Sequence, residues 1–256
     1  MSNIHITEAS ASPKVKPQPS SAKTSVPFTY FPSDDGTDEN LLIILHGLGD
    51  THVPFAHMGK QLKLPQTAVL ALRAPQQIPF MDAESYQWYP SFDPLGELIN
   101  DPDPTTGLDV LARLVEHLTG DCAWAPHQLH FFGFAQGGSL AAEFGLRWWR
   151  EHPGAAGRLG SIVTVSAPLL SYPTLSQPSP TPVLVLHTPA AKGSPFTKEA
   201  VVAYKKGYGV MKEQITGRAG MPASREEWEP IMRFWSEHLG RRQGDGLYEV
   251  MTGASR

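Results

Sequence analysis

The amino-acid sequence predicts an α/β fold in which helices cover both faces of a mainly parallel sheet. Short runs rich in Val, Leu and Ile alternate along the chain with segments of helical spacing, which is the pattern of repeated strand–helix units. The chain has 256 residues, of which 41% are apolar and 18% charged, and it can therefore bury one sizeable core. In folds of this class, ligands bind where the parallel strands end.

Seven runs have the composition of strands. Residues 28–31 have the aromatic and β-branched content of a short edge strand and are bounded by prolines. Residues 41–45 are a continuous apolar run of the kind found in buried parallel strands. The other expected strands have the same short apolar character and cover residues 68–72, 129–132, 161–165, 182–186 and 210–215.

Helical periodicity appears between these runs. Residues 107–118 carry apolar side chains three or four positions apart, and residues 225–239 place Ile231 and Trp235 on one helical face. The other expected helices cover residues 55–62, 139–149 and 198–206. Residues 77–106 are rich in Pro, Asp and aromatic side chains, and we expect a long irregular loop there, a feature that usually serves function.

The two ends of the chain differ in composition from its middle. Residues 1–24 are rich in Ser, Pro, Lys and Ala without apolar periodicity, and we expect them to form a disordered leader. Residues 25–240 form the expected single domain, and residues 241–256 a flexible polar tail. No run approaches the ~20 apolar residues that span a bilayer, and the N-terminus has no signal-peptide pattern.

Charge and cysteine content narrow the classes of function. The formal net charge is −4 and no long basic block occurs, which argues against nucleic-acid binding. The single cysteine, Cys122, excludes an internal disulfide and fits a reducing compartment, so we expect the cytoplasm or nucleus. No Lys or Arg beside it in the sequence would activate the thiol, and we expect it to be inert.

The most informative motif is the run from Gly133 to Gly138, which reads Gly-Phe-Ala-Gln-Gly-Gly between an apolar run and a helix-like run. This is the layout of a nucleophile elbow, in which a strand turns sharply into a helix and lifts one side chain into the active site. In the G-x-S-x-G form that side chain is a serine. Here Ala135 supplies a methyl group, which has no lone pair and no proton to lose.

Four stretches together resemble the phospholipase/carboxylesterase family of α/β-hydrolases, which includes the acyl-protein thioesterases. Residues 45–51 (Leu-His-Gly-Leu-Gly-Asp-Thr) resemble the family's oxyanion-hole loop, and residues 133–138 differ from its Gly-Phe-Ser-Gln-Gly-Gly elbow at one position. The other two similar stretches are Ala-Pro at 74–75 with Trp-Tyr-Pro at 88–90, and Pro-Val-Leu-Val-Leu-His at 182–187. The resemblance runs from about Val26 to Leu239 and implies an α/β-hydrolase fold.

The resemblance places the family's catalytic serine, aspartate and histidine at Ala135, Ala191 and Met221. The mechanism of the family needs a nucleophile, a base that takes its proton and an acid that orients the base. Residues 122–244 contain no aspartate and residues 188–237 no histidine, so a small shift of the alignment restores neither group. The sequence therefore predicts that the Ser-Asp-His triad is degenerate.

Binding features are retained around the missing serine. The resemblance assigns the oxyanion-hole amides to Leu48 and Gln136, which would bind a carbonyl or carboxylate oxygen without a nucleophile. Trp88, Tyr89 and Phe92 are expected to line a cleft for an apolar chain. Nothing in the sequence indicates a cofactor.

Two serines and a group of histidines are candidate substitutes for the lost chemistry. Ser166 ends an expected strand at the ligand-binding edge, whereas Ser139 lies one helical turn beyond the elbow and should point toward the sheet. Neither has an evident histidine base. His46, His52 and His57 lie near the oxyanion loop, but their spacing matches no HExxH-type zinc pattern, and we expect hydrogen-bonding roles and no metal.

Three functions remain open. The first is a non-catalytic pseudo-hydrolase that binds an acyl-type or other small-molecule ligand, or a protein partner. The second is an active carboxylesterase or acyl-thioesterase that uses non-standard residues. The third is a scaffold that docks another protein through residues 77–106 or through Trp148 and Trp149.

Overall fold

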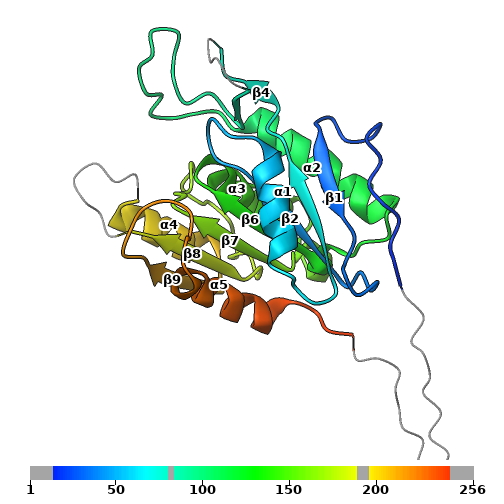
Figure 1. Ribbon diagram of the computed structural model, residues 1–256. Coiled ribbons are helices and arrows are strands. Elements are labelled where there is room, and N and C mark those ends of the chain that lie inside the picture. Colours follow the sequence, from blue (N-terminus) through cyan, green and yellow to red (C-terminus); the bar gives the residue numbers. More distant parts are fainter. Residues whose placement is uncertain (1–13, 80–83, 189–195, 243–256) are drawn as a thin grey trace, which may run out of the picture.

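A seven-stranded sheet forms the centre of the molecule (Figure 1). The computed structural model describes residues 14–79, 84–188 and 196–242. The strands lie in the order β1-β3-β2-β6-β7-β8-β9, and every neighbouring pair is parallel except β1 with β3. Their bounds are β1 Phe28–Phe31, β2 Asn40–Leu45, β3 Thr67–Leu72, β6 Leu129–Phe134, β7 Ser161–Val165, β8 Val183–His187 and β9 Met211–Ile215. The predicted mainly parallel α/β sheet is confirmed.

Helices cover both faces of this sheet (Figure 1). One face packs against α2 (Thr105–Gly120), α3 (Gln136–Glu151) and α4 (Lys198–Gly207), and the other against α1 (His52–Gln61) and α5 (Arg225–His238). In β2, Leu41, Ile43 and Leu45 join the first core and Leu42 and Ile44 the second, because successive strand residues point to opposite faces. A strand buried on both faces must be apolar throughout, which explains the continuous runs in the sequence.

The parallel register brings the carboxyl ends of several strands to one edge of the sheet. Beyond β6, the amide of Ala135 donates a hydrogen bond of 2.9 Å to the Val165 carbonyl. Beyond β7, the amide of Ser166 donates one of 2.8 Å to the Leu186 carbonyl. The segment between β5 (Tyr86–Gln87) and α2 projects past this edge at the top of Figure 1. The elbow and the long loop are therefore neighbours.

Part of the segment expected to be irregular is paired. A short strand, β4 (Gln76–Gln77), pairs antiparallel with β5, and Phe92 forms a bridge with Leu98. These pairings join residues that carry no apolar run, and so hydrophobic patterning did not indicate them. Among the described residues, no helix is long and apolar enough to cross a membrane.

The folded part of the chain begins nearer the N-terminus than the sequence suggested. Residues 14–24, which were assigned to a disordered leader, run along the carboxyl end of α2, while residues 1–13 lie outside the described part. Lys16 Nζ donates to the Ala123 carbonyl at 2.6 Å, and the Ser20 amide donates to His117 Nε2 at 3.0 Å. The composition of this segment is polar because it is held by hydrogen bonds and not by an apolar face.

Cys122 is 1% exposed beneath this segment, and burial raises the pKa of the thiol, in agreement with an inert cysteine.

Lys16 is expected to hold this N-terminal segment against the domain. Its ammonium also donates to Gln128 Oε1 at 2.6 Å and lies 4.4 Å from the centroid of the Trp124 ring. We expect Lys16→Ala to lower the free energy of unfolding by about 1 kcal/mol, because a partly exposed charged hydrogen bond is lost. Urea denaturation measures this, with the exposed Lys14→Ala as the control that should change nothing. Equal stability of the two variants would show that the segment is not anchored by Lys16.

Candidate active site

The elbow between β6 and α3 has the backbone of a nucleophile-bearing turn. Ala135 adopts φ 49° and ψ −120°, a region that residues other than glycine seldom occupy. Its amide bonds the Val165 carbonyl, and its own carbonyl accepts the amide of Ser139 at 3.0 Å. Such a conformation costs about 1–3 kcal/mol and persists only where the surroundings enforce it. The position that bears the nucleophile in an active elbow therefore keeps its strain with a methyl group in place of the hydroxymethyl.

Three glycines enforce this turn by allowing the backbones to touch. A Cβ on Gly137 would lie 2.5 Å from the carbonyl oxygens of Leu45 and His46, and one on Gly138 would lie 2.5 Å from the Ala167 Cβ. A Cβ on Gly133 would collide with the backbone of Gly137. Any side chain at these positions would push α3 away from the ends of the neighbouring strands.

The loop after β2 lies directly against the elbow. A Cβ on Gly47 would lie 3.7 Å from the Ala135 Cβ. His46, fully buried, fixes this loop: its Nδ1 bonds the Gly47 carbonyl at 2.7 Å and its Nε2 accepts the Ala74 amide at 3.0 Å. Burial lowers the pKa of His46 to about 4, so the ring is neutral at physiological pH and serves as a structural link. The expected hydrogen-bonding role of His46 is thus confirmed.

The amides of Leu48 and Gln136 are the candidate oxyanion-hole donors. Neither donates a hydrogen bond to any other residue in the described part of the chain. Gln136 is the first residue of α3, where backbone amides lack helical partners and carry partial positive charge. Two unpaired amides beside Ala135 suit the oxygen of a carbonyl or carboxylate group.

The side chain of Gln136 has a separate, structural task. Its Oε1 accepts the Trp88 amide at 3.0 Å, and its Nε2 donates to the Tyr89 carbonyl at 2.9 Å and to Ser91 Oγ at 2.6 Å. The buried amide group thereby ties the long loop to the start of α3. No spacing rule connects positions about 45 residues apart, and so the sequence did not indicate Ser91 as a partner.

The three aromatic residues expected to line a cleft do not behave alike. Trp88 is 0% exposed and its indole Nε1 donates to the His46 carbonyl at 2.9 Å. Tyr89 is 5% exposed, and its backbone carbonyl accepts the hydrogen bond from Gln136 Nε2. Both belong to the core that supports the elbow, which corrects the expectation of an open aromatic cleft. Phe92, at 53% exposed, is the member of the set that a ligand can reach from solvent.

The position to which the family resemblance assigned the histidine is apolar. Met221 lies in the loop between β9 and α5 and packs against the core that includes Phe132 and Val165. Arg218 Nη2 donates to the Met221 carbonyl at 2.5 Å, and Trp228 Nε1 to the next carbonyl at 3.1 Å. Ala191, at the position assigned to the acid, lies outside the described residues.

Ser139 and Ser166 differ in their access to the elbow. Ser139 is 2% exposed and packs beneath the turn. Ser166 is half-buried, has φ 54°, and lies level with His187 on the neighbouring strand. His187 Nδ1 contacts the Thr188 carbonyl at 3.1 Å and its Nε2 contacts Glu213 Oε1 at 2.9 Å. Because both ring nitrogens already face oxygen atoms, neither is placed to take a proton from Ser166.

The expected histidine cluster does not converge on one point. Within the described residues, no group of three or more His, Cys, Asp or Glu side chains is arranged to hold a metal ion. The arrangement around Ala135 can therefore be described as a rigid turn, two free amides and an exposed aromatic ring, held together by Gln136 and His46.

The strand order, the elbow at the end of β6 and the loop beside it define an α/β-hydrolase fold. The chain belongs to the phospholipase/carboxylesterase family. The model of this family, described as Phospholipase/Carboxylesterase, matches residues 32–206.

Similar proteins support this membership. An uncharacterized hydrolase of Mycosarcoma maydis is 36% identical over 220 residues, covering 84% of this chain and 82% of that protein. An uncharacterized hydrolase of Schizosaccharomyces pombe is 28% identical over 218 residues, covering 80% and 86%. Among solved structures, esterase PE8 aligns with a TM-score of 0.69 at 22% identity over 84% of this chain and 99% of that one. Zea mays acyl-protein thioesterase 2 aligns with a TM-score of 0.65 at 20% identity over 84% and 100%.

The close approach at Gly137 should dominate the stability of the elbow. We expect Gly137→Ala to lower the free energy of unfolding by about 3 kcal/mol, because the added methyl must displace backbone carbonyls. Gly120→Ala is the matched control, since no atom outside its own helix lies within 4 Å of a Cβ there, and its effect should stay within about 1 kcal/mol. Guanidinium denaturation compares the two. Tolerance of alanine at both positions would refute the tight turn.

Proposed function

We propose that this chain is a non-catalytic member of the phospholipase/carboxylesterase family whose elbow binds an acyl-type ligand. The observation that carries the proposal is the turn at Ala135. It has a strained backbone and two amides without a hydrogen-bond partner in the part of the chain that the structure describes, while a methyl group stands in the place of the nucleophile. A turn that costs free energy is expected to persist where it still positions something. In this chain it positions hydrogen-bond donors.

The absence of the acyl-transfer machinery rests on more than one residue. Ala135 has no nucleophilic atom, and Met221 is half-buried against the core with no group that serves as a base. An enzyme without its triad retains an acceleration of about 10³–10⁴-fold over water, which comes from binding and oxyanion stabilisation. We therefore expect hydrolysis by this chain to be far below the rate of a family enzyme.

The proposed ligand site combines polar donors beside Ala135 with apolar side chains of the neighbouring loop. The amides of Leu48 and Gln136 suit the carbonyl or carboxylate oxygen, and the amino end of α3 favours a negative charge. The long loop beside the elbow exposes Phe92, Leu95 and Leu98 at 53%, 86% and 66%. Apolar side chains left in solvent on one loop offer a surface for an acyl chain.

The same exposed loop also suits a protein partner, which is the second occupant we propose for this edge. An apolar tip on an anchored loop is a common form of protein contact surface. We expect no cofactor and no nucleic-acid partner, and the single cysteine leads us to place the protein in the cytoplasm or nucleus.

An active carboxylesterase or acyl-thioesterase that uses Ser166 is the alternative. The observation in its favour is position: Ser166 has a positive φ and follows the strand whose last carbonyl bonds Ala135. Against it, both nitrogens of the adjacent His187 face oxygen atoms. A serine without a base is a weak nucleophile.

Rebuilding the triad tests the assignment of the three positions. We expect Ala135→Ser alone to hydrolyse a short-chain nitrophenyl ester no faster than the natural protein, because a lone serine lacks its base. The triple variant Ala135→Ser, Ala191→Asp, Met221→His should exceed it by at least about a hundredfold, the contribution of general base catalysis. The double variant without Met221→His is the control for the base. If the natural protein hydrolysed the ester rapidly and the Ser166→Ala variant did not, the active alternative would be supported instead.

Removing one amide tests the ligand site without any chemistry. Leu48→Pro and Leu48→Ala both lose the exposed leucine side chain, but only proline lacks the amide hydrogen. We expect a medium-chain fatty acid to bind the alanine variant at least about tenfold more tightly than the proline variant. Only the alanine variant can donate a hydrogen bond from the amide at position 48 to the charged carboxylate. Isothermal titration measures both affinities, and thermal unfolding checks that each variant is folded. Equal affinities would exclude the Leu48 amide from the site.

A further inference from the structure

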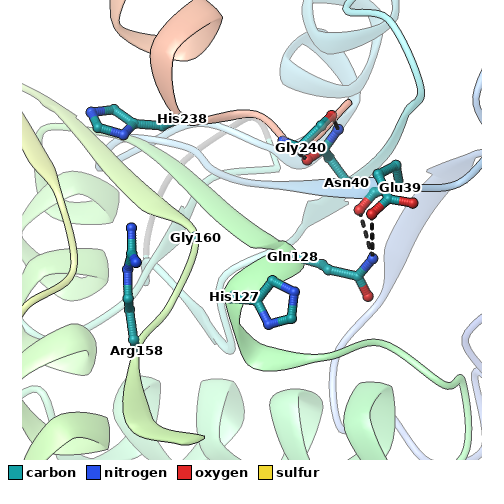
Figure 2. Close-up of a pocket in the computed structure, with 8 residues that line it drawn as sticks. All are labelled: Glu39, Asn40, His127, Gln128, Arg158, Gly160, His238 and Gly240. Carbon is teal, nitrogen blue, oxygen red and sulfur yellow. Dashed lines mark hydrogen bonds between the residues drawn. The ribbon is translucent and has the colours of Figure 1, made fainter. Parts of the chain in front are cut away.

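A cavity lies beside the residues that precede β2, β6 and β7, at the end of the sheet opposite Ala135. Figure 2 shows its lining residues. It has a volume of about 260 Å³ and is open to solvent. Its walls come from the beginning of β2 at Asn40, the short 3-10 helix Pro126–Gln128, the residues before β7 at Gly160, and the end of α5 at His238. The volume is several times the ~30 Å³ share of a water molecule and below the ~300–1,000 Å³ of most drug-sized sites, so it suits a small ligand.

Two amide side chains make the frame of this cavity rigid. Asn40 Nδ2 donates to the Gly240 carbonyl at 2.9 Å, and Asn40 Oδ1 accepts the Gly240 amide at 2.8 Å. Gln128 Oε1 accepts from Lys16 Nζ, and its Nε2 donates to the Glu39 carbonyl at 2.9 Å, as the dashed lines of Figure 2 show for the second pair. These groups are saturated with protein partners, and they hold the walls in place while leaving the ligand to other side chains.

The groups that remain available are cationic or hydrogen-bond donors. In the described part of the chain, neither the Arg158 guanidinium nor the His127 ring makes a hydrogen bond or ion pair with another residue. His238 Nε2 is shielded from solvent and has no hydrogen-bond partner among those residues, and its ion-pair contact with Glu237 Oε2 is long, at 4.0 Å. Figure 2 shows the three side chains reaching the cavity from three different segments. The one carboxylate of the wall, Glu39, accepts a hydrogen bond from Gln128 Nε2 at 3.4 Å.

A buried histidine, His130, lies behind Gly160 of the cavity wall. His130 is 0% exposed, its Nδ1 contacts Ser161 Oγ at 2.8 Å, and its Nε2 has no hydrogen-bond partner in the described chain. That ring lies against Gly160, where a Cβ would come within 2.7 Å of His130 Nε2. A side chain at position 160 would collide with the His130 ring and the His127 carbonyl, so this part of the wall requires glycine. An unpaired buried nitrogen is costly unless something satisfies it.

We propose that this cavity binds a small anion that carries a phosphate group, such as a phosphate monoester. Arg158, His127 and His238 line the cavity from three segments of the chain, and a tetrahedral group offers oxygen atoms in several directions. A carboxylate presents two oxygens in one plane and matches one guanidinium better than a three-sided set. Arg158 is the central contact because its charge is permanent, and His127 and His238 supply the flanking donors.

Phosphate binding by the full-length protein tests this site. The probes are inorganic phosphate and glycerol 3-phosphate, titrated by calorimetry at constant ionic strength set with chloride. We expect saturable binding with a dissociation constant near or below about 1 mM. Arg158→Gln should weaken it at least about tenfold, since charged hydrogen bonds are lost, and His238→Gln should weaken it several-fold. The exposed Arg150→Gln, which lies outside the cavity, is the matched control and should bind as the natural protein does.

Two results would overturn the proposal. One is the absence of saturable binding of either probe to the natural protein up to about ten times that concentration. The other is equal weakening by Arg158→Gln and Arg150→Gln, which would indicate unspecific attraction to surface charge. The outcome is independent of the elbow, because the Leu48 and Ala135 variants leave every wall of this cavity unchanged.

Discussion

The close approach of α3 to the carboxyl ends of β2, β6 and β7 is the constraint on which the rest of the site depends. Backbone meets backbone at Gly133 and Gly137, and this contact leaves no room for a Cβ. The turn at Ala135 takes a positive φ, and the first amide of α3 has no hydrogen-bond partner within the described residues. A single packing requirement thus explains the glycines, the strain and the open donor together.

Hydrogen bonds around this contact make it rigid. His46 joins the loop after β2 to the Ala74 amide, and Gln136 joins the long loop to the start of α3. Both side chains are buried and bond mainly backbone groups, so their role is to position the site. Their retention does not depend on a serine at position 135. The geometry of the turn is therefore compatible with the alanine at position 135.

Much of this architecture was predictable from local sequence. Continuous apolar runs such as residues 41–45 predict strands that are buried on both faces. The Gly-Phe-Ala-Gln-Gly-Gly run predicts a sharp turn, because the residues that shape this turn are adjacent in the sequence. The burial of Trp88 and Tyr89 was not predictable, since it depends on Gln136 some 45 residues away. The N-terminal segment was misjudged for a related reason: Lys16 is anchored by Ala123 and Gln128, and polar anchoring leaves no periodic pattern.

The central claim is that the elbow at Ala135 is a binding frame from which nucleophilic catalysis has been lost. Intact-protein mass spectrometry after incubation with a fluorophosphonate probe tests it most directly, because the probe forms a covalent bond only with an activated serine. The account predicts that the natural protein stays at its unmodified mass while an active family esterase, treated in parallel, is labelled. A stoichiometric adduct on the natural protein, mapped to Ser166 or to any other serine, would contradict the account.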